Sequence, residues 1–243
     1  RRIIVADTNN DRILIWNSWP TSNGQPADIV LDGKNKFEFG RPNKTGFSWP
    51  WGVWTDGTRL AISSIMGGYV YIWNSFPIRD NQPADLYLTA GGKMGTPRSI
   101  TSDGKCLIIG DHNARDQSCA IGNFVWQSFP TRDDQPPDFY ITDPVDPRAA
   151  WMTGAFAGDG TLVMLGSTLH VWQSCPKGSS DRPLLSVSGY RFLGGDGASV
   201  AIAGNKTFVS LYNGNKIVVY NELPRDSSKA PDYAIGSPDI HTN

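Results

Sequence analysis

A short motif that returns five times constrains this chain more than any other feature of its sequence. It reads WNSWP, WNSFP, WQSFP, WQSCP and YNELP at positions 16–20, 73–77, 126–130, 172–176 and 220–224. The lead aromatic residues are 57, 53, 46 and 48 residues apart, and a second proline follows the first after six or seven residues. A period of this length predicts a repeat architecture in which each copy is one structural unit.

Each copy is predicted to form short strands separated by turn residues, with almost no segment that suits a helix. In the first copy, Ile3–Ala6 and Arg12–Trp16 flank the turn cluster at 7–11, and another strand begins at Asp28. Later copies have a further short strand before this hairpin. Four antiparallel strands in about 40 to 50 residues are typical of β-propeller blades. We expect a single all-β domain with blades at approximately 1–40, 41–93, 94–144, 145–194 and 195–243.

The segment Val5–Ile13, VADTNNDRI, resembles the consensus of the NHL repeat. The resemblance extends over the five copies, although copies two to four depart from this segment. It implies a propeller that is usually six-bladed, with protein or peptide partners most often and RNA occasionally. Because copy one lacks its first strand, we expect a five- or six-bladed ring. A strand or blade before Arg1 would complete it, or a three-stranded blade would close the seam.

Charge and cysteine content exclude several classes of protein. The chain has 22 Lys and Arg against 23 Asp and Glu, so it offers no broad positive field for nucleic acid. No apolar stretch approaches the roughly 18 residues of a membrane helix. Cys106, Cys119 and Cys175 are odd in number and lack a C-x-x-C pair, which predicts neither a disulfide framework nor a thiolate zinc site. Cys175 is expected to be a buried, inert thiol. The compartment stays open, with a secreted, periplasmic or cell-surface location favoured over the cytoplasm.

The predicted functional face carries the turns between the second and third strands and the entrances to the blades. Arginine and tryptophan follow prolines at these entrances, and the hairpin of copy three is about seven residues longer than that of copy two. Arginine offers paired donors to a carboxylate or phosphate, and aromatic rings suit sugars, peptides or aromatic ligands. The alternatives are that the arginines form pairs at the blade junctions, that the long hairpin is a drifted solvent loop, and that the tryptophans pack between blades. The predicted ligand-binding residues are Trp51, Arg98, His112, Arg115, Asp116, Arg148 and Trp151.

A metal and a catalytic centre receive less support from the sequence. Asp7, Asp11, Asp111 and Asn213 are candidate oxygen ligands for a hard cation such as calcium at the channel mouth, with turn formation as the alternative. No other cofactor and no catalytic residue is predicted. His170 is expected to be a structural histidine between blades.

These patterns favour a non-catalytic binding or scaffolding propeller that presents a face at its central channel. The expected partner is a protein or peptide, and a small molecule or carbohydrate is the other ligand class. The first alternative is a metal-dependent hydrolase or lyase of the six-bladed type, with calcium or zinc. The second is a structural component of an extracellular or surface assembly.

Overall fold

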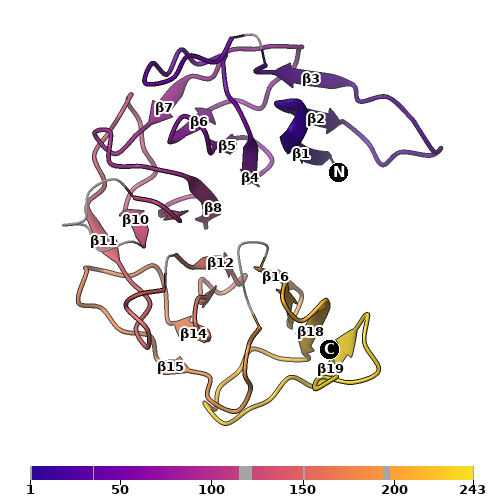
Figure 1. The fold of residues 1–243 in the computed structure, drawn as a ribbon, viewed down its shortest axis with the longest axis vertical. Coiled ribbons are helices and arrows are strands. Elements are labelled where there is room, and N and C mark those ends of the chain that lie inside the picture. The colour runs from indigo at the N-terminus through magenta and orange to yellow at the C-terminus, as the bar shows by residue number, and fades with distance from the viewer. Residues whose placement is uncertain (1, 35, 115–121, 150, 194–197, 243) are drawn as a thin grey trace.

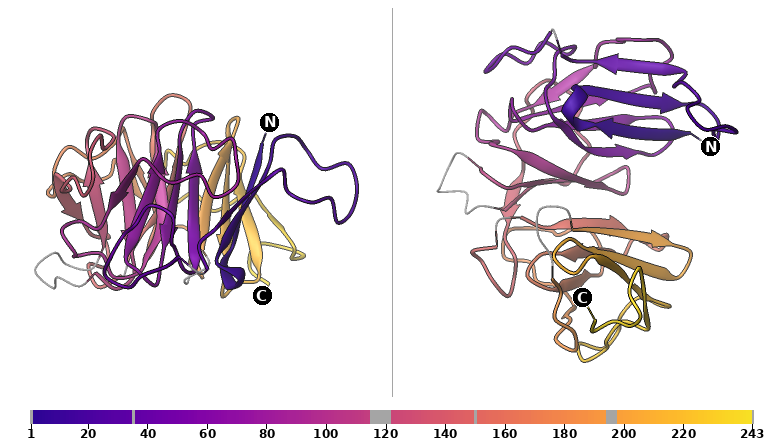
Figure 2. Two further views of the ribbon diagram at one scale, coloured as in Figure 1. Left: turned by 90° about the horizontal axis from the view of Figure 1, so that it is seen from above. Right: turned by 45° about the vertical axis from the view of Figure 1, so that its right-hand side comes forward.

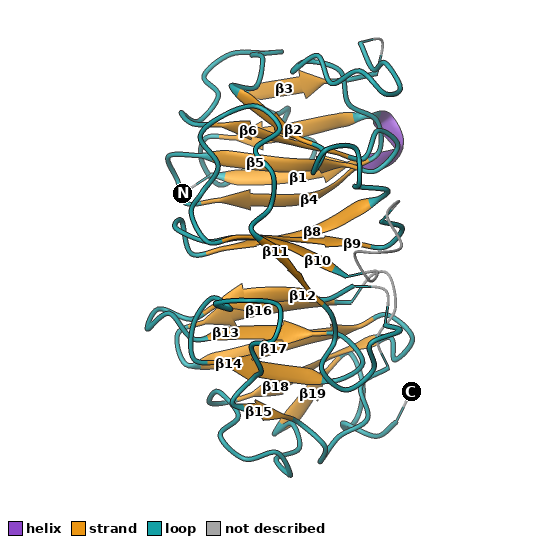
Figure 3. Ribbon diagram, turned by 90° about the vertical axis from the view of Figure 1, so that its left-hand side faces the viewer, coloured by secondary structure: helices purple, strands orange, loops and turns teal. Residues whose placement is uncertain are grey.

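The computed structural model describes residues 2–34, 36–114, 122–149, 151–193 and 198–242. Within them it forms five antiparallel sheets and one short 3-10 helix, η1 (Thr8–Asn10) (Figures 1 and 3). The strands are β1 (Ile3–Asp7), β2 (Arg12–Trp16) and β3 (Ile29–Asp32) in blade 1; β4 (Pro50–Thr55), β5 (Leu60–Ser64), β6 (Tyr69–Trp73) and β7 (Leu86–Leu88) in blade 2; β8 (Pro97–Ser102), β9 (Leu107–Asp111), β10 (Asn123–Trp126) and β11 (Phe139–Ile141) in blade 3; β12 (Thr153–Phe156), β13 (Leu162–Leu165), β14 (Leu169–Trp172) and β15 (Leu185–Ser186) in blade 4; and β16 (Ser199–Ala203), β17 (Lys206–Leu211), β18 (Lys216–Tyr220) and β19 (Tyr233–Ile235) in blade 5.

The chain is a five-bladed β-propeller, which confirms the predicted fold class. The sheets keep sequence order, so each blade is a meander, and the first strands of successive blades lie side by side around the centre. Blade 1 has three strands, as expected from a copy that begins in its second strand. Figure 1 shows the blades as an arc whose two ends are blade 1 and blade 5. No helix in the described part of the chain has the length and apolar content to cross a bilayer.

In blades 1, 2 and 3 the repeated motif ties the strand that carries it to the turn that follows. Trp73 is buried, and its indole N–H donates to the carbonyl of Gln82 at 2.9 Å. The carboxylate of Asp85 accepts a hydrogen bond from the backbone N–H of Asn74 at 2.7 Å. Copies one and three repeat both contacts at the same spacing. The motif therefore combines a core side chain with the polar groups that fix the loop.

The loop that follows the motif also holds the outer strand of the preceding blade. Between blades 1 and 2, Asp80 accepts a hydrogen bond from the N–H of Val30, and Asn81 accepts one from the N–H of Asp32, both at 2.8 Å. The N–H of Asn81 donates in return to the carbonyl of Val30 at 3.0 Å. These bonds satisfy backbone groups that the edge of a sheet would otherwise expose.

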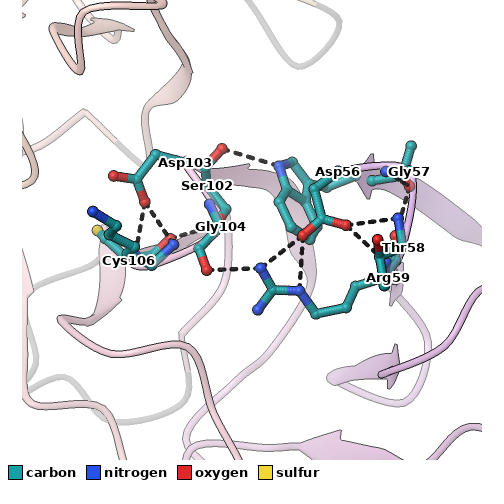
Figure 4. A network of polar contacts seen from close by, with 11 residues as sticks. Asp56, Gly57, Thr58, Arg59, Ser102, Asp103, Gly104 and Cys106 are labelled. Carbon is teal, nitrogen blue, oxygen red and sulfur yellow. Dashed lines mark hydrogen bonds and ion pairs between the residues drawn. The ribbon is translucent and has the colours of Figure 1, made fainter.

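The fourth motif residue makes a second contact with the preceding blade. The guanidinium carbon of Arg2 lies 4.2 Å from the ring centroid of Phe76, and that of Arg59 lies 3.9 Å from the centroid of Phe129. Both distances are within cation–π range. Figure 4 shows Arg59 held in place by the carboxylate of Asp56 and by the carbonyl of Gly104, each 2.7 Å away.

Blades 3 and 4 are joined at the same place by a disulfide between Cys106 and Cys175. The prediction that Cys175 is an inert thiol outside any disulfide is therefore wrong. In the aligned repeats Cys106 occupies the position of Arg59, and Cys175 occupies that of Phe129. The propeller brings these two positions together at the junctions of blades 1 and 2 and of blades 2 and 3 as well, so two cysteines placed there meet although they lie 69 positions apart.

Candidate functional site

Four inner strands enclose the candidate site, a pocket of about 320 Å³ in the central channel. Its lining comes from β4, β8, β12 and β16, together with Trp151 shortly before β12 and Ala198 directly before β16. This volume lies at the lower end of the range typical of small-molecule sites, about 300–1,000 Å³. The lining residues are Trp51, Gly52, Val53, Arg98, Ser99, Ile100, Trp151, Thr153, Gly154, Ala198, Ser199 and Val200.

Two irregularities in strand pairing place the main side chains of this pocket. The register of β4 against β5 shifts between Pro50 and Val53, around Trp51. The register of β8 against β9 shifts next to Arg98, between Pro97 and Ser99. A bulge of this kind interrupts the regular alternation of side chains and re-aims the residue within it, often beside a functional site. Pro50 and Pro97 thus each lead directly into a bulge at the channel.

Arg98 and Trp51 form the most distinctive pair in the pocket. The guanidinium carbon of Arg98 lies 4.7 Å from the ring centroid of Trp51, within the range of a cation–π contact. The Trp51 side chain keeps 37% of its surface exposed, so its ring is only partly covered. A planar donor group and an aromatic face are therefore presented together to a molecule in the channel.

Gly52 permits the close approach of β4 and β8 that holds this pair. Its N–H donates to the hydroxyl of Ser63 at 2.7 Å. A Cβ at this position would lie only 2.4 Å from the carbonyl oxygen of Arg98, closer than such atoms can approach. A residue with a side chain would therefore force the two strands apart.

The structure brings together three of the seven predicted ligand-binding residues, namely Trp51, Arg98 and Trp151. Arg148 is not part of the pocket. Its side chain is 93% exposed, and its Nε lies 3.4 Å from a carboxylate oxygen of Asp146. The reason is local: β4 and β8 begin at their entrance prolines, whereas β12 begins six residues after Pro147.

The long hairpin of copy three contributes no described residue to the pocket lining. His112 is half-buried, and its N–H donates to the carbonyl of Thr96 at 3.3 Å, while its ring lies beside the amide of Asn113. The other two predicted residues of this hairpin, Arg115 and Asp116, lie outside the described residues.

The candidate metal ligands of blade 1 serve the turn in which they lie. The Nε of Arg12 donates to Asp7 at 2.6 Å, and this hydrogen bond holds the pKa of the Asp7 carboxyl below its usual range. Asp11 accepts a hydrogen bond from the N–H of Trp49 at 2.7 Å, which fixes the entrance to blade 2. Both carboxylates have partners from the protein itself.

Asp111 plays the same part at the entrance to blade 3. It is fully buried and accepts hydrogen bonds from the N–H groups of Gly95 at 2.8 Å and Thr96 at 2.9 Å. Asn213 lies between β17 and β18 in blade 5, and its N–H donates to the carbonyl of Leu193. Among the described residues, no group of three or more His, Cys, Asp and Glu side chains is arranged to hold a metal ion.

A buried Asp-His-Ser chain lies in blade 4, where sequence reasoning identified no such set. The Nε2 of His170 lies 3.2 Å from a carboxylate oxygen of Asp143, and its Nδ1 lies 2.8 Å from the hydroxyl of Ser186. His170 is fully buried with both ring nitrogens partnered, which confirms its predicted structural role. Asp143 and His170 lie 27 positions apart in the sequence, a separation that hides this pair from any motif search.

This row of hydrogen-bonded Asp, His and Ser side chains holds the entrance to blade 4 in place. Asp143 also accepts hydrogen bonds from the N–H groups of Val145, Asp146 and Ser167 and from the Ser167 hydroxyl, so its oxygens are occupied. Burial alone would raise the pKa of the Asp143 carboxyl, but the hydrogen bonds from His170 and the backbone outweigh it and hold that pKa well below its usual range.

Comparison with known proteins supports the fold and goes no further. No protein-family model matches the chain, and no curated protein shows significant similarity to it. The resemblance to NHL repeats therefore stays a prediction. A putative 6-phosphogluconolactonase from Bacteroides uniformis is 13% identical, with a TM-score of 0.56, over 99% of this chain and 69% of its own.

Two further solved structures are similar at the same level. The dihydro-heme d1 dehydrogenase NirN gives a TM-score of 0.53 at 13% identity, over 98% of this chain and 44% of its own. The computationally designed protein Ika8 gives a TM-score of 0.51 at 13% identity, over 99% of this chain and 61% of its own. The chain thus spans between 44% and 69% of the length of these three structures. Likeness at such low identity concerns the propeller fold alone.

Proposed function

We propose that this propeller binds a small, anionic, hydroxyl-rich molecule, such as a sugar acid or its phosphate, in the channel pocket. The observation that carries the proposal is the Arg98 guanidinium stacked over Trp51 at 4.7 Å inside a pocket of about 320 Å³. A guanidinium can offer two parallel N–H donors to a carboxylate or phosphate. An indole face offers apolar contact to a sugar ring at little cost in side-chain entropy.

The size and lining of the pocket favour a small molecule over a peptide. The volume is near the lower limit for a ligand site, and hydroxyl-bearing residues such as Thr153 and Ser199 contribute to the lining. The lining residues from the described part of the chain include no His, Asp, Glu or Cys, the side chains that most often serve in acid–base catalysis. This lining favours binding over turnover.

The test is a calorimetric titration with three probes: 6-phosphogluconate, gluconate and glucose. The phosphate is chosen because one structural neighbour is named for the corresponding lactonase. We expect both anions to bind, and the neutral sugar to bind at least tenfold more weakly, since only the anions engage the guanidinium. Arg98→Gln should weaken binding of both anions at least tenfold. Arg148→Gln is the matched control, because its side chain is 93% exposed and lies outside the pocket.

The proposal fails if neither anion binds, or if Arg98→Gln binds both as the unchanged protein does. Hydrolysis of the 6-phosphogluconolactone above its spontaneous rate, lost in Arg98→Gln, would instead support the lactonase-like alternative. Trp51 provides an independent signal, since a ligand on its ring should change tryptophan fluorescence in the unchanged protein, and Trp51→Leu should reduce this change to the part that Trp151 contributes.

A further inference from the structure

Trp49 lies at the entrance to blade 2, beside the channel pocket but outside its lining, and it is 46% exposed. Trp51 follows it after Pro50, and two residues of chain span at most about 7 Å. The hydroxyl of Thr8 in η1 donates to the carbonyl of Pro50 at 2.8 Å, so this entrance lies on the same face as η1. The left view of Figure 2 shows η1 at the end of the strands opposite the N-terminus.

The channel pocket lies toward this same face. Its lining residues belong to the first four residues of β4, β8, β12 and β16 or lie just before these strands. The strand β4 begins on the η1 face, and the other three begin there too, because blades 2 to 4 are antiparallel meanders of four strands. A ligand too long for the pocket would therefore extend over the face on which Trp49 lies.

The backbone of Trp49 has a conformation that bulky residues rarely adopt. Its φ is 52°, in the left-handed region, whereas Thr96, which precedes Pro97 at the entrance to blade 3, has no positive φ. Two hydrogen bonds hold Trp49 in this conformation. Its N–H donates to the Asp11 carboxylate at 2.7 Å, and its carbonyl accepts from the N–H of Ile65 at 3.2 Å. Strained residues of this kind persist only where their surroundings hold them, and they cluster at ligand sites.

The connection that carries Trp49 is the longest between successive blades. It spans 33–49, whereas the connections before β8, β12 and β16 span 89–96, 142–152 and 187–198. Connections of more than about 12 to 15 residues are uncommon in compact domains and are often functional. Where this connection ends, the N–H of Met66 donates to the carbonyl of Ser48 at 3.4 Å, and Met66 is itself 46% exposed. Two exposed apolar residues are therefore placed side by side next to the pocket.

We propose that the ligand is an oligosaccharide with an acidic end, which places its acidic unit in the pocket and its next, neutral sugar on the ring of Trp49. This inference rests on the proposed function, because the acidic unit is the ligand proposed for Arg98. The pocket volume of about 320 Å³ is near the lower limit for a ligand site, which suits one sugar unit and leaves the next at the rim. An indole face gives a sugar ring apolar contact at little cost in side-chain entropy, and the fixed backbone of Trp49 lowers that cost further.

The test compares gluconate by calorimetry with two longer acids, cellobionate and maltobionate, in which a neutral glucose unit is joined to gluconate through a β or an α linkage. At least one longer acid should bind about fivefold or more tightly than gluconate, because only the longer acids reach Trp49. Trp49→Gly should bring the affinities for that acid and for gluconate to within about twofold of each other. Glycine adopts a φ of 52° without strain, so this variant should melt no lower than the unchanged protein. Trp19→Ser is the matched control and should keep the full difference, because Trp19 is 71% exposed beyond the far end of β2.

The outcomes separate this inference from the proposed function. If gluconate binds and neither longer acid binds more tightly, or if Trp49→Gly keeps the difference between them, this inference alone is overturned. If none of the three acids binds, the proposed function fails and this inference fails with it. If the difference depends on Trp49 while Arg98→Gln binds all three acids as the unchanged protein does, the site at Trp49 is supported and the proposed role of Arg98 fails. The comparison of the three acids on the unchanged protein needs no variant, so it decides the question whether or not Trp49→Gly folds.

Discussion

Removal of the disulfide between blades 3 and 4 should lower the stability of the propeller by a magnitude that follows from chain length. Cys106 and Cys175 have their Cα atoms 6.3 Å apart and lie 69 positions apart in sequence. The loop-closure relation for a loop of that size gives about 4 kcal/mol of stabilisation, through restriction of the unfolded chain. For a chain of this length, the loss corresponds to a fall in melting temperature of about 8 to 16 °C.

The assay is thermal unfolding of the double variant Cys106→Ala/Cys175→Ala beside the unchanged protein, without reductant. Cys119→Ala is the control, because it keeps both bonded cysteines, and it should melt as the unchanged protein does. Titration of thiols in denaturant should find one free thiol among the three cysteines. Three free thiols, or a double variant that melts at the unchanged temperature, would refute the reasoning.

Three further changes should act through single contacts. Asp143→Asn should lower the free energy of unfolding by about 1.5 to 3 kcal/mol at neutral pH, because charge-assisted hydrogen bonds are lost. Since the pKa of Asp143 is lowered in the folded protein, this loss of stability should shrink as the pH falls below about 4. Denaturant unfolding at several pH values would detect the change. Gly52→Ala should cost about 1 to 3 kcal/mol, because the new Cβ meets the carbonyl of Arg98, and it should also weaken ligand binding in calorimetry. Asp85→Ala should cost about 1 kcal/mol in urea melts, because the N–H of Asn74 loses its acceptor.

The fold was predictable from sequence because every blade carries its own copy of the same local signals. A buried tryptophan such as Trp73, a turn closed by the carboxylate of Asp85 and strands of alternating pattern recur at a regular period. Each of these signals lies within a short stretch of residues, so it can be recognised from this one sequence. The disulfide was not predictable in this way, because Cys106 and Cys175 become neighbours only through the stacking of one blade on the next.

The candidate site was predictable only where the repeat kept its register. Trp51 and Arg98 follow their entrance prolines directly into a strand, and the structure places both in the pocket. Arg148 follows a proline in the same way, but extra residues before β12 leave it in solvent. Sequence position relative to a proline thus predicts a place in the channel only when the strand begins at that proline.

The contacts between blades show that the repeat conserves places within this chain while the chemistry at each place varies. One junction holds Arg2 over Phe76, the next holds Arg59 over Phe129, and the third holds the disulfide from Cys106 to Cys175. A cation on a ring and a covalent bond both join adjacent blades, since what the architecture requires is any attraction between two side chains at that separation. Because each blade contacts only its neighbours, such changes remain local.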